Sequence, residues 1–223
     1  MFYGELLYVI LVPLTILGLV VLAILALSGR SDPDSRGDRP YVLYLSLVSY
    51  LALFTVLFAL VDLASTAMDA VVGNGPEHLY PSYIGSGPTP DLDFEGELRT
   101  RAALNSGAIA LAAGAVLLFH QKRSRRLVHE PGFAGSSGAR TFSAYLYAVA
   151  FTSMAIVLAA GALALPALVR TVAPGLTAIE SSTAERDSAL SDLVPALVAG
   201  AGAGAIYVIH WRAATRLRHG EDL

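Results

Sequence analysis

Residues 6–27 read LLYVILVPLTILGLVVLAILAL, a stretch of 22 residues without one charged side chain. A helix of roughly 20 apolar residues crosses the hydrocarbon core of a bilayer, which is about 30 Å thick. Further long apolar stretches lie at Tyr41–Val72, Ala102–Phe119, Phe142–Val169 and Leu193–Ile209. None of them shows the alternating pattern of a barrel strand, so helices are the spanning element we expect. The sequence therefore predicts an all-α integral membrane bundle of five transmembrane helices.

The composition of the whole chain agrees with this fold class. Hydrophobic residues make up 55% of the 223 residues, charged residues make up 15%, and the mean hydropathy is +0.59. Soluble domains carry about 25% charged residues. This composition therefore excludes a soluble enzyme domain, a disordered tail and a nucleic-acid binder. The chain has no cysteine, which also excludes disulfides, thiolate metal sites and cysteine nucleophiles.

Basic and aromatic residues predict the orientation in the membrane. Eleven of the fifteen Lys and Arg residues lie before the second stretch, between the third and fourth, or after the fifth. Because positively charged loops remain in the cytoplasm, we expect an outer N-terminus and a cytoplasmic C-terminus in the plasma membrane. The aromatic residues that open or close the stretches at those ends agree, since such rings favour the headgroup level. No basic segment precedes residues 6–27, so we expect a retained helix rather than a cleaved signal peptide.

Two pairs of stretches align with each other. The second and fourth align without a gap at an offset of 101 residues, which pairs Tyr44 with Tyr145. The third and fifth align at an offset of 90, which pairs His120 with His210. We interpret this as a duplicated two-helix unit. Both units start in the cytoplasm, so the repeats are parallel and related by an axis along the membrane normal.

The duplication sets the expected domain organisation. Residues 1–39 form an N-terminal transmembrane helix with a cytoplasmic linker. Residues 40–217 form a four-helix membrane domain, with repeat one at 40–127 and repeat two at 141–217. Residues 218–223 form a cytoplasmic tail.

Short motifs in this domain carry a resemblance to a known family. They are Tyr44-Leu45 and Tyr145-Leu146 at the starts of the long helices, and His210-Trp211-Arg212 at the end of the last helix. Over residues 40–217 the chain resembles an uncharacterised family of bacterial and archaeal multi-pass membrane proteins, grouped as a domain of unknown function. The resemblance implies a membrane location and a repeated four-helix core. It implies no activity, substrate or cofactor.

Small residues predict which helices pack closely. Ala196, Gly200 and Gly204 recur every four residues in the fifth stretch, and Gly107 and Gly114 mark the third. Membrane helices associate where small residues let their backbones approach. We therefore expect the third and fifth helices in the core, and the Leu-rich and Val-rich first helix at the periphery.

Asp62 is the one acidic residue with apolar sequence on both sides within a stretch. Ser65, Thr66 and Asp69 follow it on the same helix face. A carboxylate in a membrane helix faces the bundle interior or water. It is then a proton- or cation-responsive group lining an outward cavity, part of a structural ion pair, or a residue at the point where the helix leaves the hydrocarbon for the headgroups. The offset of 101 places Asp69 opposite Arg170, so we hypothesise that Arg170 pairs with Asp69 or Asp62.

His120 and His210 end equivalent helices at one expected depth. Two histidines on neighbouring helices are the axial ligands of a b-type haem, and the alternative is that both lie among lipid headgroups with no cofactor. Basic residues at the same ends are expected to contact anionic headgroups. They are Lys122, Arg123, Arg125, Arg126, Arg212 and Arg216.

The outer loop expected at residues 73–100 is longer than most connections, and long loops are often functional. Its segment 91–96 resembles the start of an EF-hand calcium loop, but Ala102 stands where the bidentate glutamate is needed. The alternatives to a calcium site are a partner-docking segment, a short strand or lid formed by Leu92 to Leu98, or a solvated connection with no specific role.

These observations leave three functions open. The first is a non-enzymatic scaffold or accessory subunit of a membrane assembly. The second is a small proton- or cation-coupled carrier or channel-like protein that uses Asp62, and the third is a b-type haem electron-transfer subunit that uses His120 and His210. The sequence contains no phosphate-binding loop, dinucleotide fingerprint, nucleophile elbow or H-E-x-x-H motif, so no catalytic or metal-binding residue is assigned. The expected partners are the lipid bilayer and a homo-oligomer or larger membrane complex.

Overall fold

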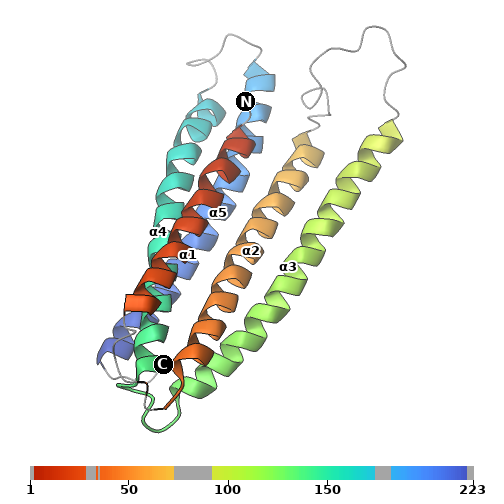
Figure 1. The fold of residues 1–223 in the computed structure, drawn as a ribbon. Helices are drawn as coiled ribbons and strands as arrows, with labels where there is room; N and C mark the ends of the chain where they lie inside the picture. Colours follow the sequence, from red (N-terminus) through yellow and green to blue (C-terminus); the bar gives the residue numbers. More distant parts are fainter. Residues whose placement is uncertain (1–2, 29–33, 35, 73–91, 174–181, 220–223) are drawn as a thin grey trace.

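The computed structural model describes residues 3–28, 34, 36–72, 92–173 and 182–219. Within these ranges the chain forms five helices and no strand: α1 (Tyr3–Ser28), α2 (Arg39–Val72), α3 (Leu92–Val128), α4 (Ser137–Val172) and α5 (Ser182–His219). Each of the five is long and apolar enough to span a membrane. They run side by side along one direction (Figure 1). The prediction of an all-α fold with five apolar helices is confirmed.

Helix α3 is longer than the apolar stretch that predicted it. It begins at Leu92, so the short strand considered for Leu92 to Leu98 is wrong. Its first turns carry an ion pair one turn apart, in which the guanidinium of Arg101 lies 2.6 Å from the carboxylate of Glu97. Pairs at this spacing stabilise a helix outside the hydrocarbon. Residues 73–91, which include most of the expected loop and the start of the calcium-like segment, lie outside the described residues.

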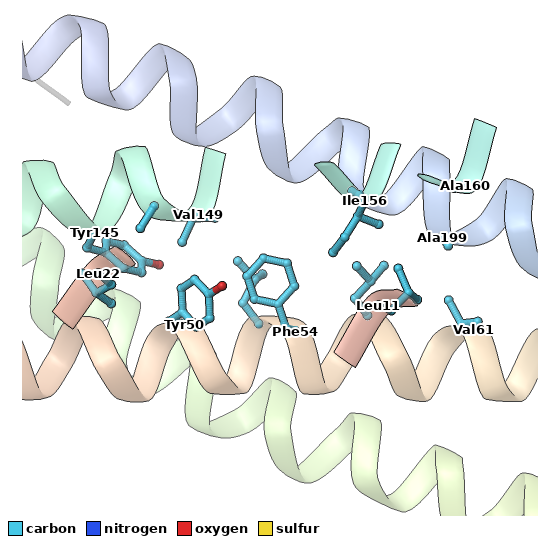
Figure 2. Close-up of a cluster of buried hydrophobic side chains, with 14 of the residues drawn as sticks. Leu11, Leu22, Tyr50, Phe54, Val61, Tyr145, Val149, Ile156, Ala160 and Ala199 are labelled. Carbon is cyan, nitrogen blue, oxygen red and sulfur yellow. The ribbon is translucent and has the colours of Figure 1, made fainter. Parts of the chain in front are cut away.

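The core lies between α1, α2, α4 and α5. Large buried side chains from three of these helices meet there, among them Leu11, Tyr50, Phe54 and Ile156 (Figure 2). The small residues of α5 bring its backbone close to two neighbours. A Cβ built on Gly202 would lie 2.7 Å from a methyl group of Leu57 in α2, and one on Gly200 would lie 3.4 Å from the Cβ of Ala160 in α4. The expectation that α5 is a core helix is confirmed.

Helix α1 is largely exposed, as its composition suggests: 22% of its apolar span is buried, against 44% in α2 and 39% in α4. Its backbone meets α2 and α4 at Gly18, where an added Cβ would collide with side chains of both helices. The hydroxyl of Tyr50 donates to the carbonyl oxygen of Thr15 at 2.9 Å and lies 2.9 Å from Oγ1 of Thr152. One glycine and one buried polar contact thus dock an otherwise leucine-rich helix. The opposite face of α1 is exposed.

Helix α3 is the peripheral helix, which corrects the expectation that its small residues place it in the core. Among the described residues it packs along α2 and makes no comparable contact with α1, α4 or α5; it lies at the edge of the bundle (Figure 1). In its apolar span 6% of the residues are buried, against 33% in α5. A Cβ built on Gly107 or on Gly114 would have no neighbouring atom within 4 Å. The reason is that α1 and α5 already cover α4.

Candidate functional site

The half-buried carboxylate of Asp62 joins three helices. It accepts a hydrogen bond from the hydroxyl of Tyr8 in α1 at 3.2 Å. It also accepts one from the hydroxyl of Ser106 in α3, a side chain that is buried. Two hydroxyl donors satisfy part of the acceptor capacity of a carboxylate in an apolar span. Asp62 therefore ties the peripheral helix α3, and the N-terminal helix α1, to α2.

The other residues of the predicted polar stripe do not join this cluster. Ser65 donates to the carbonyl oxygen of Val61 at 3.1 Å, and Thr66 donates to that of Asp62 at 3.0 Å, both within α2. Asp69 is exposed and interacts electrostatically with Arg99 of α3. Of the four residues, only Asp62 is hydrogen-bonded to other helices through its side chain in the described structure.

Arg170 has a different carboxylate partner from the two that the repeat suggested. Its guanidinium lies 2.8 Å from the carboxylate of Asp192 in α5, and both side chains are mostly buried, at 19% and 13% exposed. Asp62 binds Tyr8 and Ser106, so the hypothesis of a pair with Asp62 or Asp69 gains no support. The reason is adjacency, because α4 packs on α5 far more extensively than on α2. Asp192 stands directly before the apolar stretch from Leu193, and its position next to that boundary is the signal that sequence reasoning missed.

The two histidines have nearly the same surroundings at the other end of the bundle. Nδ1 of His120 lies 2.8 Å from the carbonyl oxygen of Val116, and Nδ1 of His210 lies 2.9 Å from that of Ile206. A carbonyl oxygen only accepts, so each Nδ1 carries the hydrogen. Both imidazoles are buried.

Each histidine also packs on a tyrosine of the preceding helix. The ring centroids of His120 and Tyr44 are 5.7 Å apart, and those of His210 and Tyr145 are 5.8 Å apart. The hydroxyl of Tyr145 lies 3.4 Å from Nε2 of His210, which is the acceptor nitrogen of that ring.

This geometry does not fit a bis-histidine haem. An axial ligand would bind iron through Nε2, because Nδ1 is engaged with the backbone, and the phenol of Tyr145 stands at Nε2 of His210. The described part of the chain also contains no group of three or more His, Cys, Asp or Glu side chains arranged to hold a metal ion.

The basic residues expected to contact lipid headgroups are all exposed at the end of the bundle that carries His120 and His210, called the histidine end below. The guanidinium of Arg123 also lies over the ring of Phe119, 5.9 Å from its centroid. The face of an aromatic ring attracts a cation, so this contact helps to hold the guanidinium of Arg123 at the end of α3. The remaining members of the set are Lys122, Arg125, Arg126, Arg212 and Arg216.

A polar junction at this end was missed by the sequence reasoning. Arg36 lies 2.6 Å from the carboxylate of Asp38 and 3.0 Å from that of Glu130, and it donates to the carbonyl oxygen of Pro131 at 2.6 Å. Asp34 accepts a hydrogen bond from the hydroxyl of Ser137 at 2.6 Å, which is the main reason that its pKa lies below the usual range. Glu130, Pro131 and Ser137 lie 94 to 103 residues from their partners Arg36 and Asp34 in the sequence, so only the tertiary structure brings them together.

Comparison with protein-family models, with curated proteins and with solved structures gave no match to this chain. The family resemblance over residues 40–217 therefore stays a prediction.

Proposed function

We propose that the protein is a non-enzymatic scaffold or accessory subunit of an assembly in the plasma membrane, with α3 as the helix that meets the partner. The packing of α3 carries this proposal. It touches the rest of the chain through α2, and nearly all of its apolar span is open. A helix held by a single neighbour is available to a second helix without any rearrangement of the core.

The open face of α3 has the surface that another membrane helix requires. Large apolar side chains project from it, with exposed fractions of 69% for Leu104, 77% for Leu111 and 70% for Leu118. Exposed small residues at Ala108 and Ala112 lie between them. Membrane helices associate by close packing at small residues, because lipid tails compete equally well for large apolar ones.

Asn105 distinguishes this face from a surface made for lipid alone. Its carboxamide is exposed and has no hydrogen-bond partner among the described residues. Lipid tails offer no donor or acceptor, whereas amide side chains form hydrogen bonds between membrane helices. Asn105 lies one turn after Arg101, near the end of the apolar span, and we expect the partner helix to carry a polar side chain at this depth.

The absence of cysteine from the chain permits a direct test. A single cysteine at Leu111→Cys, labelled with a benzophenone maleimide and irradiated in native membranes, is expected to give an adduct with another membrane protein. The matched control is Leu158→Cys on α4, which is also well exposed, at 64%, and is expected to react with lipid only. Equal adducts at both positions, or none at either, would contradict the proposal. An adduct of twice the subunit mass would assign the face to a second copy instead.

We also propose that residues 40–127 and 141–217 are copies of one parallel unit. The two Tyr–His pairs support this, because their centroid distances differ by a tenth of an ångström and both histidines donate to the carbonyl four residues earlier. Each unit also has an acid opposite an arginine at the far end. In the first the acid is Asp69 on the leading helix, and in the second it is Asp192 on the following one.

The proposed orientation places the histidine end in the cytoplasm. It is tested with a maleimide that does not cross membranes. Val71→Cys, at the far end of α2 and 80% exposed, is expected to be labelled in intact cells. His129→Cys, which is exposed near the histidine end, is expected to be labelled only after permeabilisation. The reverse labelling pattern would show that the histidine end lies outside the cell and would refute the proposed orientation.

The contacts favour neither alternative function. A carrier that uses Asp62 needs water at its carboxylate, and the hydroxyls of Tyr8 and Ser106 take up part of the acceptor capacity of that carboxylate. A haem subunit needs Nε2 of His210, where Tyr145 stands.

A further inference from the structure

Three serine hydroxyls in the core have no hydrogen-bond partner among the residues that the structure describes. They belong to Ser46 and Ser49 of α2 and to Ser153 of α4, which are 1%, 2% and 0% exposed. A buried hydroxyl without a partner costs free energy, so the large majority of such groups in folded proteins bind a protein atom or an ordered water molecule. The three hydroxyls together therefore point to a ligand inside the bundle.

Other hydroxyls of the same helices find their partner locally. Thr55 and Ser65 of α2 and Thr152 of α4 each donate to the carbonyl oxygen four residues earlier, at 2.8, 3.1 and 2.9 Å. Each of the three serines has a carbonyl oxygen at the same position in its own helix. Their hydroxyls do not use it, so they are turned toward something else.

Ser46 lies on the face of α2 that meets α4. A methyl group of Val42, one turn before it, lies 3.2 Å from the position of a Cβ built on Gly138 at the start of α4. The hydroxyl of Tyr50, one turn after it, lies 2.9 Å from Oγ1 of Thr152. Residues four positions apart share one helix face, so Ser46 faces α4 between these two contacts.

Ser49 lies at the depth of His210. Helices α2 and α5 run in opposite directions (Figure 1) and meet at Gly202, where an added Cβ would lie 2.7 Å from Leu57. Ser49 lies eight residues before Leu57, and His210 lies eight residues after Gly202. At about 1.5 Å per residue, both are about 12 Å from that contact, toward the histidine end.

Tyr145 and His210 add polar atoms to the same half of the core. Tyr145 is buried, and Figure 2 shows its ring directed into the core between α2 and α4. Its hydroxyl lies 3.4 Å from Nε2 of His210, which is longer than the usual range of about 2.5–3.2 Å for a hydrogen bond. Ser153 directly follows the residue that contacts Tyr50. The unpartnered hydroxyls and this loose pair thus lie where α2, α4 and α5 meet.

We propose that ordered water binds at this meeting point, called the serine junction, through the hydroxyls of Ser46, Ser49 and Ser153, with Tyr145 and His210 as its polar wall. A buried water molecule typically makes about three hydrogen bonds to groups that have no other partner. A serine hydroxyl both donates and accepts, so it can bind water in either direction. Water bridges then join α5 to α2 and α4. The site is independent of the role of α3.

Radiolytic footprinting detects such water, because an X-ray pulse forms hydroxyl radicals from the water molecule itself and these oxidise the nearest ring. The full-length protein in lipid nanodiscs is irradiated, and oxidation is measured by mass spectrometry at three buried rings, those of Tyr145, Phe54 and Phe133. We expect several-fold more oxidation at Tyr145 than at Phe54, which lies deeper in the apolar core, or at Phe133, which controls for bulk water at the histidine end. Equal oxidation of the three rings would overturn the proposal.

Two variants that each remove two hydroxyls identify the groups that hold the water. Ser49→Ala/Ser153→Ala is expected to lower the oxidation of Tyr145 several-fold. The control Ser65→Ala/Thr66→Ala removes hydroxyls that donate within α2 and is expected to leave it unchanged. No decrease in the first variant, or the same decrease in both, would refute the serine junction. If the first variant does not fold, Ser49→Ala alone provides the same readout with a partial decrease.

Discussion

Replacing Gly18 by alanine is expected to destabilise the bundle by about 2–4 kcal/mol. The added methyl group would collide with Oγ1 of Thr152 and the hydroxyl of Tyr50, and both of these side chains are fully buried. Neither can move aside without breaking a contact that joins α1, α2 and α4. Overpacking a core costs about 1–3 kcal/mol. A lost hydrogen bond between membrane helices adds about 0.6 kcal/mol on average, and up to about 1.7.

The assay is reversible unfolding in mixed micelles with increasing sodium dodecyl sulfate, followed by circular dichroism. Gly161→Ala on α4 is the matched control, because no atom lies within 4 Å of its added Cβ. Alanine is the better helix former, so this variant is expected to be neutral or more stable by up to about 1 kcal/mol. A Gly18→Ala protein as stable as the control would refute the docking of α1 described above.

A double-mutant cycle identifies the atom responsible. Thr152→Ala removes Oγ1, one of the two atoms in the collision, at the cost of the contact with Tyr50. The double variant Gly18→Ala/Thr152→Ala is expected to cost less than the sum of the two single changes, because the second substitution makes room for the first. Additive costs would mean that Thr152 does not limit the space at Gly18.

Three further predictions concern polar contacts. Arg170→Leu and Asp192→Leu are each expected to cost about 1–3 kcal/mol in the same unfolding assay, since each removes one partner of a mostly buried ion pair. The double variant is expected to recover most of the loss. A double variant as unstable as the sum of the two single changes would contradict this. Asp62→Asn keeps an acceptor oxygen for one of the two hydroxyls of Tyr8 and Ser106 and presents an amide N–H that can donate to the oxygen of the other. It is expected to cost less than about 1 kcal/mol, against about 1–2 for Asp62→Leu. Equal costs would show that the charge itself is needed. The Ser137 hydroxyl holds the pKa of Asp34 below its usual value of about 3.9, so the ionised carboxylate stabilises the fold above that pH, and the contribution is lost as the pH falls through the lower folded pKa. The Ser137→Ala protein is therefore expected to lose less stability between pH 5 and pH 2, measured as the shift in its unfolding midpoint. An unchanged loss of stability would exclude this hydrogen bond.

The sequence alone determined the number of helices and the class of the fold. Apolar stretches of about 20 residues leave the backbone no partner but itself in hydrocarbon, so helices follow from length and composition. Two constant offsets, which align Tyr44 with Tyr145 and His120 with His210, were also visible in the sequence. The structure adds that each histidine lies against the tyrosine of its own unit and donates to the carbonyl oxygen four residues earlier.

The tertiary structure alone decided which helix is central and which is open. Composition placed α3 in the core, and the structure places it at the edge; α1 is exposed along most of its span, as expected, but is docked at Gly18. A small residue permits two helices to approach closely but does not specify which helix approaches. The single Gly18 of α1 lies against α2 and α4, whereas Gly107 and Gly114 of α3 lie against no other helix. For the same reason the partners of Asp62 and Arg170 could not be read from the chain. Such contacts depend on how helices far apart in sequence cross, and local periodicity carries no information about that crossing.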